Sequence, residues 1–208
     1  MNNILDELPC KAGWLTGARS DPITGLVAFP DLYPRAVVDA LDSAAAEHTL
    51  FGLAIGDVDD LKIHVEHTNA TDPDSFGHLA GNALMTELGA VCREWFADTE
   101  LPAGCVSTFG GDEVIIVATG ITERGFTDSV TDLRDRCRDA LPCTVSFAST
   151  VVGPGLVWPS KDPAVRAKFL LAAVDRALFA AKASRRAARG PAGAVVTVDL
   201  AQAVRDAA

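Results

Sequence analysis

CVSTFGGDEVIIV, residues 105–117, is the most informative stretch of this chain. Two short runs of strand-forming residues flank a turn that holds two glycines, Gly110 and Gly111, and two carboxylates, Asp112 and Glu113. Because β-branched and aromatic residues favour strands while glycines favour the turn between them, the stretch predicts a β-hairpin with acidic groups at its tip. Backbone N–H groups of a Gly-Gly turn approach phosphate oxygens closely, since no side chain stands in the way. The hairpin tip therefore suits a divalent metal and a phosphate.

A second acidic tip lies upstream of the hairpin. The apolar segment 50–58 predicts a buried central strand and delivers Asp57 to its end. Mg²⁺ is usually held by one or two carboxylates together with substrate phosphates, so two strand ends that bring Asp57 and Asp112 together supply that pair. Taken alone, residues 57–60 fit a solvated acidic turn equally well. Together with the hairpin they predict a metal-dependent nucleotide site.

Six motifs of the chain, in order, resemble those of the GGDEF family, the diguanylate cyclases. GGDEV at 110–114 resembles the signature itself, with Val114 in place of the usual Phe. The other five are DPITGL at 21–26, which resembles D-x-L-T-G-L; DVDDLK at 57–62, which resembles D-I-D-x-F-K; GHLAGN at 77–82, which resembles G-H-x-x-G-D; TVSF at 144–147, which resembles T-V-S-I; and VDRALFAAK at 174–182, which resembles A-D-x-A-L-Y-x-A-K. The match spans residues 21 to about 186.

The resemblance implies an α/β palm like those of GGDEF domains and adenylyl cyclases, in which helices flank a central, mainly antiparallel sheet. A chain of 208 residues with 49% hydrophobic content suits one ordinary domain. We therefore expect residues 1–20 to form an N-terminal arm and residues 21–208 to form a single GGDEF-like catalytic domain.

The resemblance also implies a metal site for Mg²⁺ or Mn²⁺. The side chains of Asp57 and Asp112 and the carbonyl of Val58 are its expected ligands, and Glu113 assists metal binding. Asp112, Glu113 and Lys62 are the expected catalytic residues.

A phosphate-binding set follows from the same comparison. Lys62, Lys182 and Arg186 are expected to contact the triphosphate, together with the backbone of Gly110 and Gly111. Lys182 and Arg186 are four residues apart, so one helix face can present both cations to one triphosphate. The activity implied is transfer of nucleotidyl groups between two GTP molecules to give cyclic di-GMP and pyrophosphate. Because each domain holds one GTP, two copies must face each other, and we expect a homodimer, stable or transient.

The residues expected to read the base depart from the family pattern. Residues 63–76 form a longer, polar segment with turn signals, which predicts an inserted loop. The base-reading Asn of the family aligns with Val65, which cannot hydrogen-bond, and Asn69 in the inserted segment is a candidate substitute. Asn82 stands where the family has Asp and offers guanine one acceptor and one donor, a pattern that also suits an adenine edge. GTP is the first expectation, and ATP stays open.

Two further hypotheses follow from these departures. One is a divergent enzyme of the same type that cyclises or hydrolyses a single purine nucleotide, GTP or ATP. The other is a non-catalytic nucleotide-binding regulator. Residues 101–104 lack the R-x-x-D motif of product inhibition, so feedback by a cyclic dinucleotide at that position is not expected.

Composition excludes several partners. A formal charge of −10 argues against a general nucleic-acid surface, because phosphate backbones need clustered Lys and Arg. Residues 1–10 show no signal-peptide pattern, and no stretch is long enough to span a bilayer. Five cysteines without C-x-x-C spacing fit reduced thiols, most of them in the core, and we expect a cytoplasmic protein.

Further elements are predicted from periodicity and turn signals. They are a helix over 32–46 capped by Asp31; a helix after Gly77-His78 that buries Leu79, Ala83, Leu84, Leu88, Val91 and Trp95; a helix over 126–140; a strand over 143–152; a helix from about 163 that buries Phe169, Leu170, Val174, Leu178 and Phe179; and an edge strand over 194–198.

Overall fold

The computed structural model describes residues 10–11, 15, 17–188 and 192–206. Within them, six strands form one sheet in the order β1-β3-β4-β2-β5-β6. The four inner strands pair antiparallel, whereas β1 and β6 at the two edges run parallel to their neighbours. The strands are β1 (Val27–Ala28), β2 (Leu50–Val58), β3 (Ala103–Phe109), β4 (Glu113–Ile121), β5 (Val145–Val152) and β6 (Val195–Thr197). The predicted hairpin, the central strand and the mainly antiparallel sheet are confirmed.

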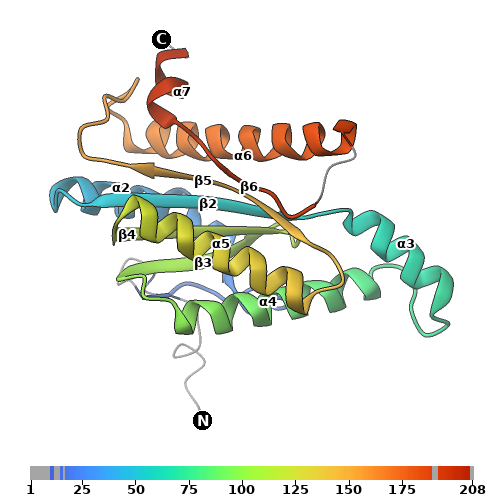
Figure 1. The fold of residues 1–208 in the computed structure, drawn as a ribbon. Coiled ribbons are helices and arrows are strands. Elements are labelled where there is room, and N and C mark those ends of the chain that lie inside the picture. The colour runs from blue at the N-terminus through green and yellow to red at the C-terminus, as the bar shows by residue number, and fades with distance from the viewer. Residues whose placement is uncertain (1–9, 12–14, 16, 189–191, 207–208) are drawn as a thin grey trace.

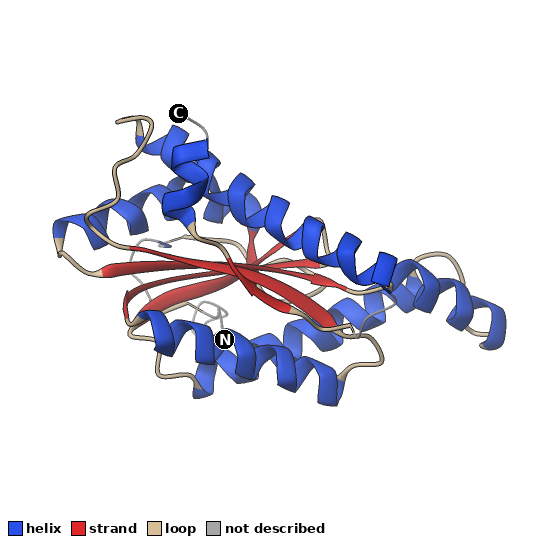
Figure 2. Ribbon diagram, turned by 45° about the horizontal axis from the view of Figure 1, so that its top comes forward, coloured by secondary structure: helices blue, strands red, loops and turns tan. Residues whose placement is uncertain are grey.

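Helices cover both faces of the sheet (Figures 1 and 2). α2 and α6 pack on one face, and α4 and α5 pack on the other, while α3 extends beyond the ends of the strands. The helical segments are α1 (Phe29–Asp31), the π-helical turn η3 (Leu32–Ala36), α2 (Val37–Ala46), α3 (Leu61–Thr71), α4 (Leu79–Asp98), α5 (Glu123–Ala140), α6 (Pro163–Ala188) and α7 (Leu200–Asp206).

Two hydrophobic cores lie on the two faces of the sheet because side chains alternate along each strand. On β2, Leu53 and Ile55 belong to the core under α2 and α6, whereas Ala54 and Val58 belong to the core over α4 and α5. Each fully buried Leu or Phe contributes about 1.5–3 kcal/mol to stability. Because the two cores cover both faces of the inner strands, charged side chains are accommodated at the strand ends. The acidic residues of β2 and of the hairpin lie there.

The predicted inserted loop at 63–76 is wrong. Most of it is the helix α3, and only residues 72–78 form turns. The segment 61–71 contains no Gly or Pro, so its backbone can continue as a helix from the end of β2. None of its side chains is buried, and hence it lacks the apolar periodicity by which a helix is predicted.

The predicted cap of the helix over 32–46 is also wrong. Asp31 lies at the end of α1, where its carboxylate accepts hydrogen bonds from the backbone N–H and the guanidinium of Arg19 at 2.9 and 3.0 Å. A π-helical turn follows, and the regular helix α2 begins at Val37.

Three residues predicted to be buried are exposed. Leu79 is 46% exposed and Ala83 is exposed, because the first turns of α4 lie next to α3 beyond the main body of the sheet. Phe179 on α6 is 72% exposed and lines a cleft at the end of the strands instead of the core. The other predicted core positions of α6, namely Leu170, Val174 and Leu178, are buried, and Phe169 is half-buried.

The N-terminal arm lies largely outside the described residues. Its described part contacts the core. The backbone of Cys10 pairs with that of Cys105 on β3 in an isolated antiparallel β-bridge, both cysteines being free thiols, and Leu15 and Ala18 are buried. Cys92 and Cys137 are buried as well, in agreement with their predicted role as small core residues. Among the helices that the structure describes, none combines the length and apolar character needed to cross a membrane.

Candidate active site

The tip of the hairpin is shaped by two left-handed residues, Gly110 with φ 66° and Gly111 with φ 100°. A side chain at either position meets no close neighbour, so the backbone conformation is what requires glycine. Asp57 on β2 is the register partner of Glu113 at the start of β4, and the N–H of Val58 donates to the carbonyl of Asp112 at 3.2 Å. The two acidic tips predicted from the sequence therefore meet.

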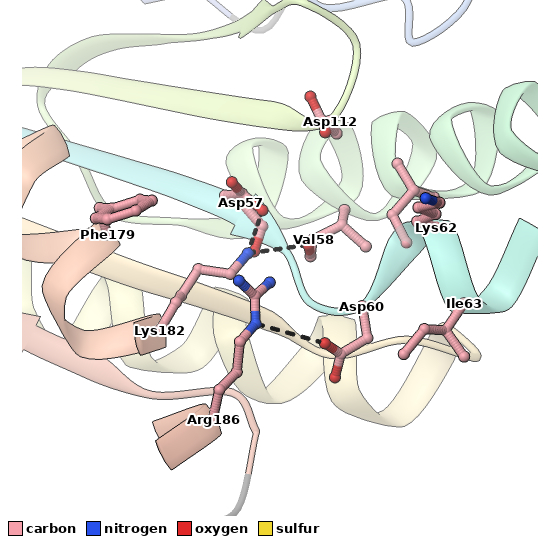
Figure 3. A pocket seen from close by; sticks show the side chains of 10 residues that line it. Asp57, Val58, Asp60, Lys62, Ile63, Asp112, Phe179, Lys182 and Arg186 are labelled. Atoms are coloured by element: carbon pink, nitrogen blue, oxygen red, sulfur yellow. Dashed lines mark hydrogen bonds and ion pairs between the residues drawn. The ribbon is translucent and has the colours of Figure 1, made fainter. Parts of the chain in front are cut away.

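A cleft of about 420 Å³ opens at this point (Figure 3). It is bounded by the end of β2, the hairpin turn, the start of α3 and the end of α6. Six of the residues predicted from the sequence line it: Asp57, Val58, Lys62, Asp112, Lys182 and Arg186. Lys62 and Lys182 lie on opposite sides of Asp57 and Val58 in this view, so positive charge flanks the carboxylates.

Lys182 is the buried cation of the cleft, with 8% of its side chain exposed. Its Nζ pairs with the carboxylate of Asp57, donates to the carbonyl of Val58 at 3.0 Å and lies 3.4 Å from Oδ1 of Asp59. It therefore occupies the side-chain and carbonyl oxygens that were predicted to hold metal. The spacing along α6 predicted a phosphate ligand at this residue but not its contact with the strand end.

Asp59 is a buried carboxylate that the sequence analysis did not single out. It accepts hydrogen bonds from the hydroxyls of Thr144 and Ser146, each at 2.8 Å, and from the N–H of Gly193 at 2.9 Å. Burial by itself raises the pKa of Asp59, but the bonds from Gly193, Ser146 and Thr144 outweigh burial and lower the pKa below its ordinary value. Asp59 thus stays charged and fixes the end of β2 to β5 and to the segment before β6.

Arg185 is a second contributor that sequence reasoning missed. Its side chain is 11% exposed, and Nη2 lies 3.2 Å from both carboxylate oxygens of Asp60. Asp60 has a left-handed backbone, φ 56°, and precedes the first residue of α3. Arg186 is more exposed and lies 3.9 Å from Asp60, so it can turn toward a ligand.

The carboxylates of the site carry more negative charge than Lys182 offsets. Burial raises the pKa of Asp57, an effect that Lys182 opposes and that Asp112 reinforces. Burial together with the charges of Asp57, Asp175 and Asp112 raises the pKa of Glu113 to about 7. Excess negative charge in a half-buried place attracts cations.

The donor set fits a hard divalent metal. Carboxylates of Asp57 and Asp112 and the carbonyl of Val58 face the cleft, and oxygen is the donor type that Mg²⁺ and Mn²⁺ prefer. No group of three or more His, Cys, Asp or Glu side chains that could hold a metal is found among the described residues. A metal here would therefore need substrate phosphates to complete its coordination, as is usual for Mg²⁺.

The remaining predicted residues do not line this cleft. Asn69, on α3 and not in a loop, donates to the carbonyl of Gly77 at 3.0 Å and accepts from Ser75 at 2.6 Å, so it fixes the turn after its helix. Asn82 is exposed on α4. Gly110 and Gly111 form the adjoining hairpin tip, and Glu113 lines a separate cavity on the face covered by α6. Of the residues predicted to bind metal or phosphate, all the charged ones except Glu113 line the cleft, whereas Asn69 and Asn82, predicted to read the base, do not.

Comparison with known proteins gives a result at the level of structure. No family model matches the sequence, and no curated protein matches it. Several solved structures match it. One is the GGDEF domain of DgcB from Caulobacter crescentus in complex with c-di-GMP, which has a TM-score of 0.66 and 17% sequence identity to this chain. The match covers 86% of this chain and 93% of that one.

Two other solved structures give the same result. A microbial GGDEF domain studied for its interaction with cyclic di-GMP is 22% identical with a TM-score of 0.64, over 88% of this chain and 98% of that one. The FimX GGDEF domain from Pseudomonas aeruginosa is 16% identical with a TM-score of 0.61, over 86% of this chain and 98% of that one. The chain has the fold of GGDEF domains, which confirms the fold expected from its motifs.

Proposed function

We propose that this chain is a metal-dependent nucleotidyl cyclase of the diguanylate cyclase type. It joins two GTP molecules into cyclic di-GMP and releases two pyrophosphates. The observation that carries the proposal is the cleft itself, where Asp57 and Asp112 meet Lys62, Lys182 and Arg186 on a GGDEF-type fold. The similar domain of DgcB was solved with c-di-GMP bound, which supports this choice of product.

The metal is proposed to be Mg²⁺ or Mn²⁺, held by Asp57, Asp112 and the carbonyl of Val58, with Glu113 adding negative charge beside them. When bound, it lowers the pKa of the attacking 3′-hydroxyl and neutralises phosphate charge. Lys182 must then release Asp57 and Val58, and its freed Nζ can turn to the triphosphate. The buried cation thus holds the carboxylates in place before substrate arrives and stabilises phosphate charge afterwards.

Lys62 and Arg186 act from the open side of the cleft. Lys62 is exposed and lies 3.7 Å from Glu66, and Arg186 has 59% of its side chain exposed. Exposed ion pairs of this kind are weak, at about 0–1 kcal/mol, so a triphosphate can displace them readily. Together with Lys182 they stabilise the charge that builds up on the leaving pyrophosphate. Two copies must face each other to complete both phosphodiester bonds, so the active form is a homodimer, stable or transient.

One observation favours a second candidate function. Val65, at the position of the family's base-reading Asn, lies half-buried on α3 against α4, where a Cβ placed on Gly81 would touch it at 3.5 Å. This contact is apolar and offers no hydrogen bond to a base. The alternative is therefore an enzyme of the same type that cyclises or hydrolyses a single purine nucleotide, GTP or ATP.

Incubation of the full chain with Mn²⁺ or Mg²⁺ and either GTP or ATP, followed by chromatography and mass spectrometry, tests these functions. Cyclic di-GMP formed from GTP supports the first proposal. A cyclic mononucleotide, a nucleoside diphosphate or any product of ATP favours the second. Nucleotide binding without turnover contradicts both and leaves the regulator hypothesis.

A further inference from the structure

A second cavity, of about 430 Å³, lies on the face of the sheet that α6 covers. It is formed by α1, η3, the hairpin and the first half of α6, and the described residues that line it are distinct from those of the metal cleft. Its walls are mostly apolar, and its polar lining residues are Tyr33, Glu113, Lys168 and Asp175. Concave sites of this size and composition are typical of small-molecule binding.

An aromatic cluster forms one wall. The ring of Phe29 lies 4.2 Å from that of Phe109, tilted by 47°, and stacks on Tyr33 at 5.8 Å. Phe109 is 46% exposed, although it sits at the end of a strand whose other residues are largely buried. Aromatic rings with accessible faces attract cations, and the attraction strengthens when the cation is removed from water.

Two carboxylates lie in the same cavity. Glu113 on β4 is half-buried, Asp175 on α6 is exposed, and both line the cavity. Among the described residues, no hydrogen bond or ion pair is found for either side chain, although the charge of Lys182 acts on Glu113. Lys168 is the cation of this cavity, but it precedes Asp175 by seven residues on α6, roughly 10 Å along the helix, and its side chain is exposed. Asp57, Asp112 and Asp175 all act on Glu113 with negative charge against the single cation Lys182, so the carboxylate end of the cavity carries an excess of negative charge.

We propose that this cavity binds a small organic cation with a single charged group, an amine or amidinium on an apolar body about the size of one ring. Strongly hydrated inorganic ions are poorly served by aromatic walls, whereas an organic cation can place its charge at Glu113 and Asp175 and its apolar part against Phe109. Lys168 at the far end disfavours a second positive charge, so the site selects monocations over elongated diamines.

Isothermal titration of the full chain, free of metal and nucleotide, tests the proposal with benzamidine, which is cationic at neutral pH, and benzamide, its neutral counterpart of the same shape. Benzamidine is expected to bind about tenfold more tightly than benzamide. Asp175→Asn and Phe109→Ala should each weaken benzamidine binding by about fivefold or more, and Asp175→Glu should retain it. Glu87→Gln, an exposed carboxylate on α4 across the sheet, is the matched control and should change nothing.

Asp112→Asn distinguishes binding in this cavity from binding in the metal cleft, because Asp112 lines the cleft and does not line this cavity. Benzamidine affinity should stay within about twofold in this variant. Loss of binding in Asp112→Asn with retention in Asp175→Asn would place the cation in the cleft and overturn the proposal, as would equal binding of benzamide or no binding at all. Thermal melts verify that each variant is folded. Since no nucleotide or metal is present, the result is independent of whether the proposed cyclase activity exists.

Discussion

The two ends of the candidate active site are built differently. Where β2 meets α6, buried charges fix one another: Asp59 holds β5 and Gly193, and Lys182 spans Asp57, Asp59 and Val58. Where α3 meets α4, no side chain of α3 is buried and Asn82 is exposed. The first end has the chemistry for phosphate and metal, and the second is where the base is expected. Under the proposed function, the residues that contact phosphate and metal would be fixed by the core, whereas those that read the base would lie on a surface that can vary without cost to the fold.

Of the variants that test the difference between the two ends, Asp112→Ala is expected to have the largest effect on turnover. Loss of a metal carboxylate should lower metal-dependent turnover by at least about a thousandfold, or roughly 4 kcal/mol, because charge stabilisation in the transition state depends on it. Product formation from GTP and ATP measures the loss, with Glu87→Gln as the control. Turnover within tenfold of the original chain would remove Asp112 from the proposed centre.

A stability effect of about 3 kcal/mol is expected from Asp59→Ala, since the change breaks a buried charged network and leaves Ser146 and the N–H of Gly193 without their acceptor. Urea unfolding measures it. The matched control is Asp60→Ala: that side chain is 43% exposed, and its loss should cost about 1 kcal/mol or less. Equal losses in the two variants would contradict the contrast between a fixed strand end and an adaptable one.

The pH dependence of stability has a predictable sign at Glu113. Its folded-state pKa of about 7 lies above the ordinary Glu value, so the folded chain binds more protons than the unfolded chain between about pH 4.5 and pH 7. In metal-free buffer the free energy of unfolding should fall as pH rises through this window, by about 2 kcal/mol after allowance for solvent screening.

Urea unfolding at pH 5 and pH 8 measures this slope, and Glu113→Gln should flatten it. Mn²⁺ added at pH 8 should recover part of the lost stability if the metal binds beside Glu113. The contribution of Asp59 has the opposite sign: because its pKa is lowered, its stabilisation is present above the unfolded value and is lost as pH falls below about 4. An unchanged slope in Glu113→Gln would show that another group titrates in this window.

The smallest effect is expected at the exposed end, from Asn82→Asp. If residue 82 reads the base, the ratio of GTP to ATP turnover should rise, by about fivefold, or roughly 1 kcal/mol. Competition between the two nucleotides in one reaction measures the ratio directly. A ratio that does not move would mean that the base is read elsewhere than at residue 82.

How much the sequence predicts depends on whether a contact is local. The hairpin at 105–117 and the strand 50–58 were predicted because β-branched residues and glycines act over a few positions. α3 was missed because a helix without buried side chains has no hydrophobic period, and because its turn residues lie at and beyond its end. The resemblance to the GGDEF motifs predicted that Lys182 and Arg186 contact the triphosphate, and both line the cleft with Asp57.

The contacts that hold the site together could not be predicted from local pattern. Asp59 bonds to residues 85 to 134 positions away, and Lys182 to residues about as distant. Asp59 is one of three aspartates in residues 57–60, and nothing in the sequence marks it as the buried one. An Arg near the end of a helix is explained by a favourable interaction with the helix dipole alone. Only the folded chain shows that Asp59 and Arg185 belong to the site.

The hydrogen bond from the N–H of Gly193 to Asp59 has a consequence for how the protein is made. Asp57 to Asp60 and the hairpin precede Gly193 in the chain by about 80 residues or more, yet Asp59 receives one of its three hydrogen bonds from Gly193, after those from Thr144 and Ser146. Until residue 193 has left the ribosome, the strand end carries a desolvated carboxylate with an incomplete set of donors. The cleft therefore reaches its final shape late relative to its own strands, so a nascent chain should acquire the capacity to bind a triphosphate only after residue 193 has emerged.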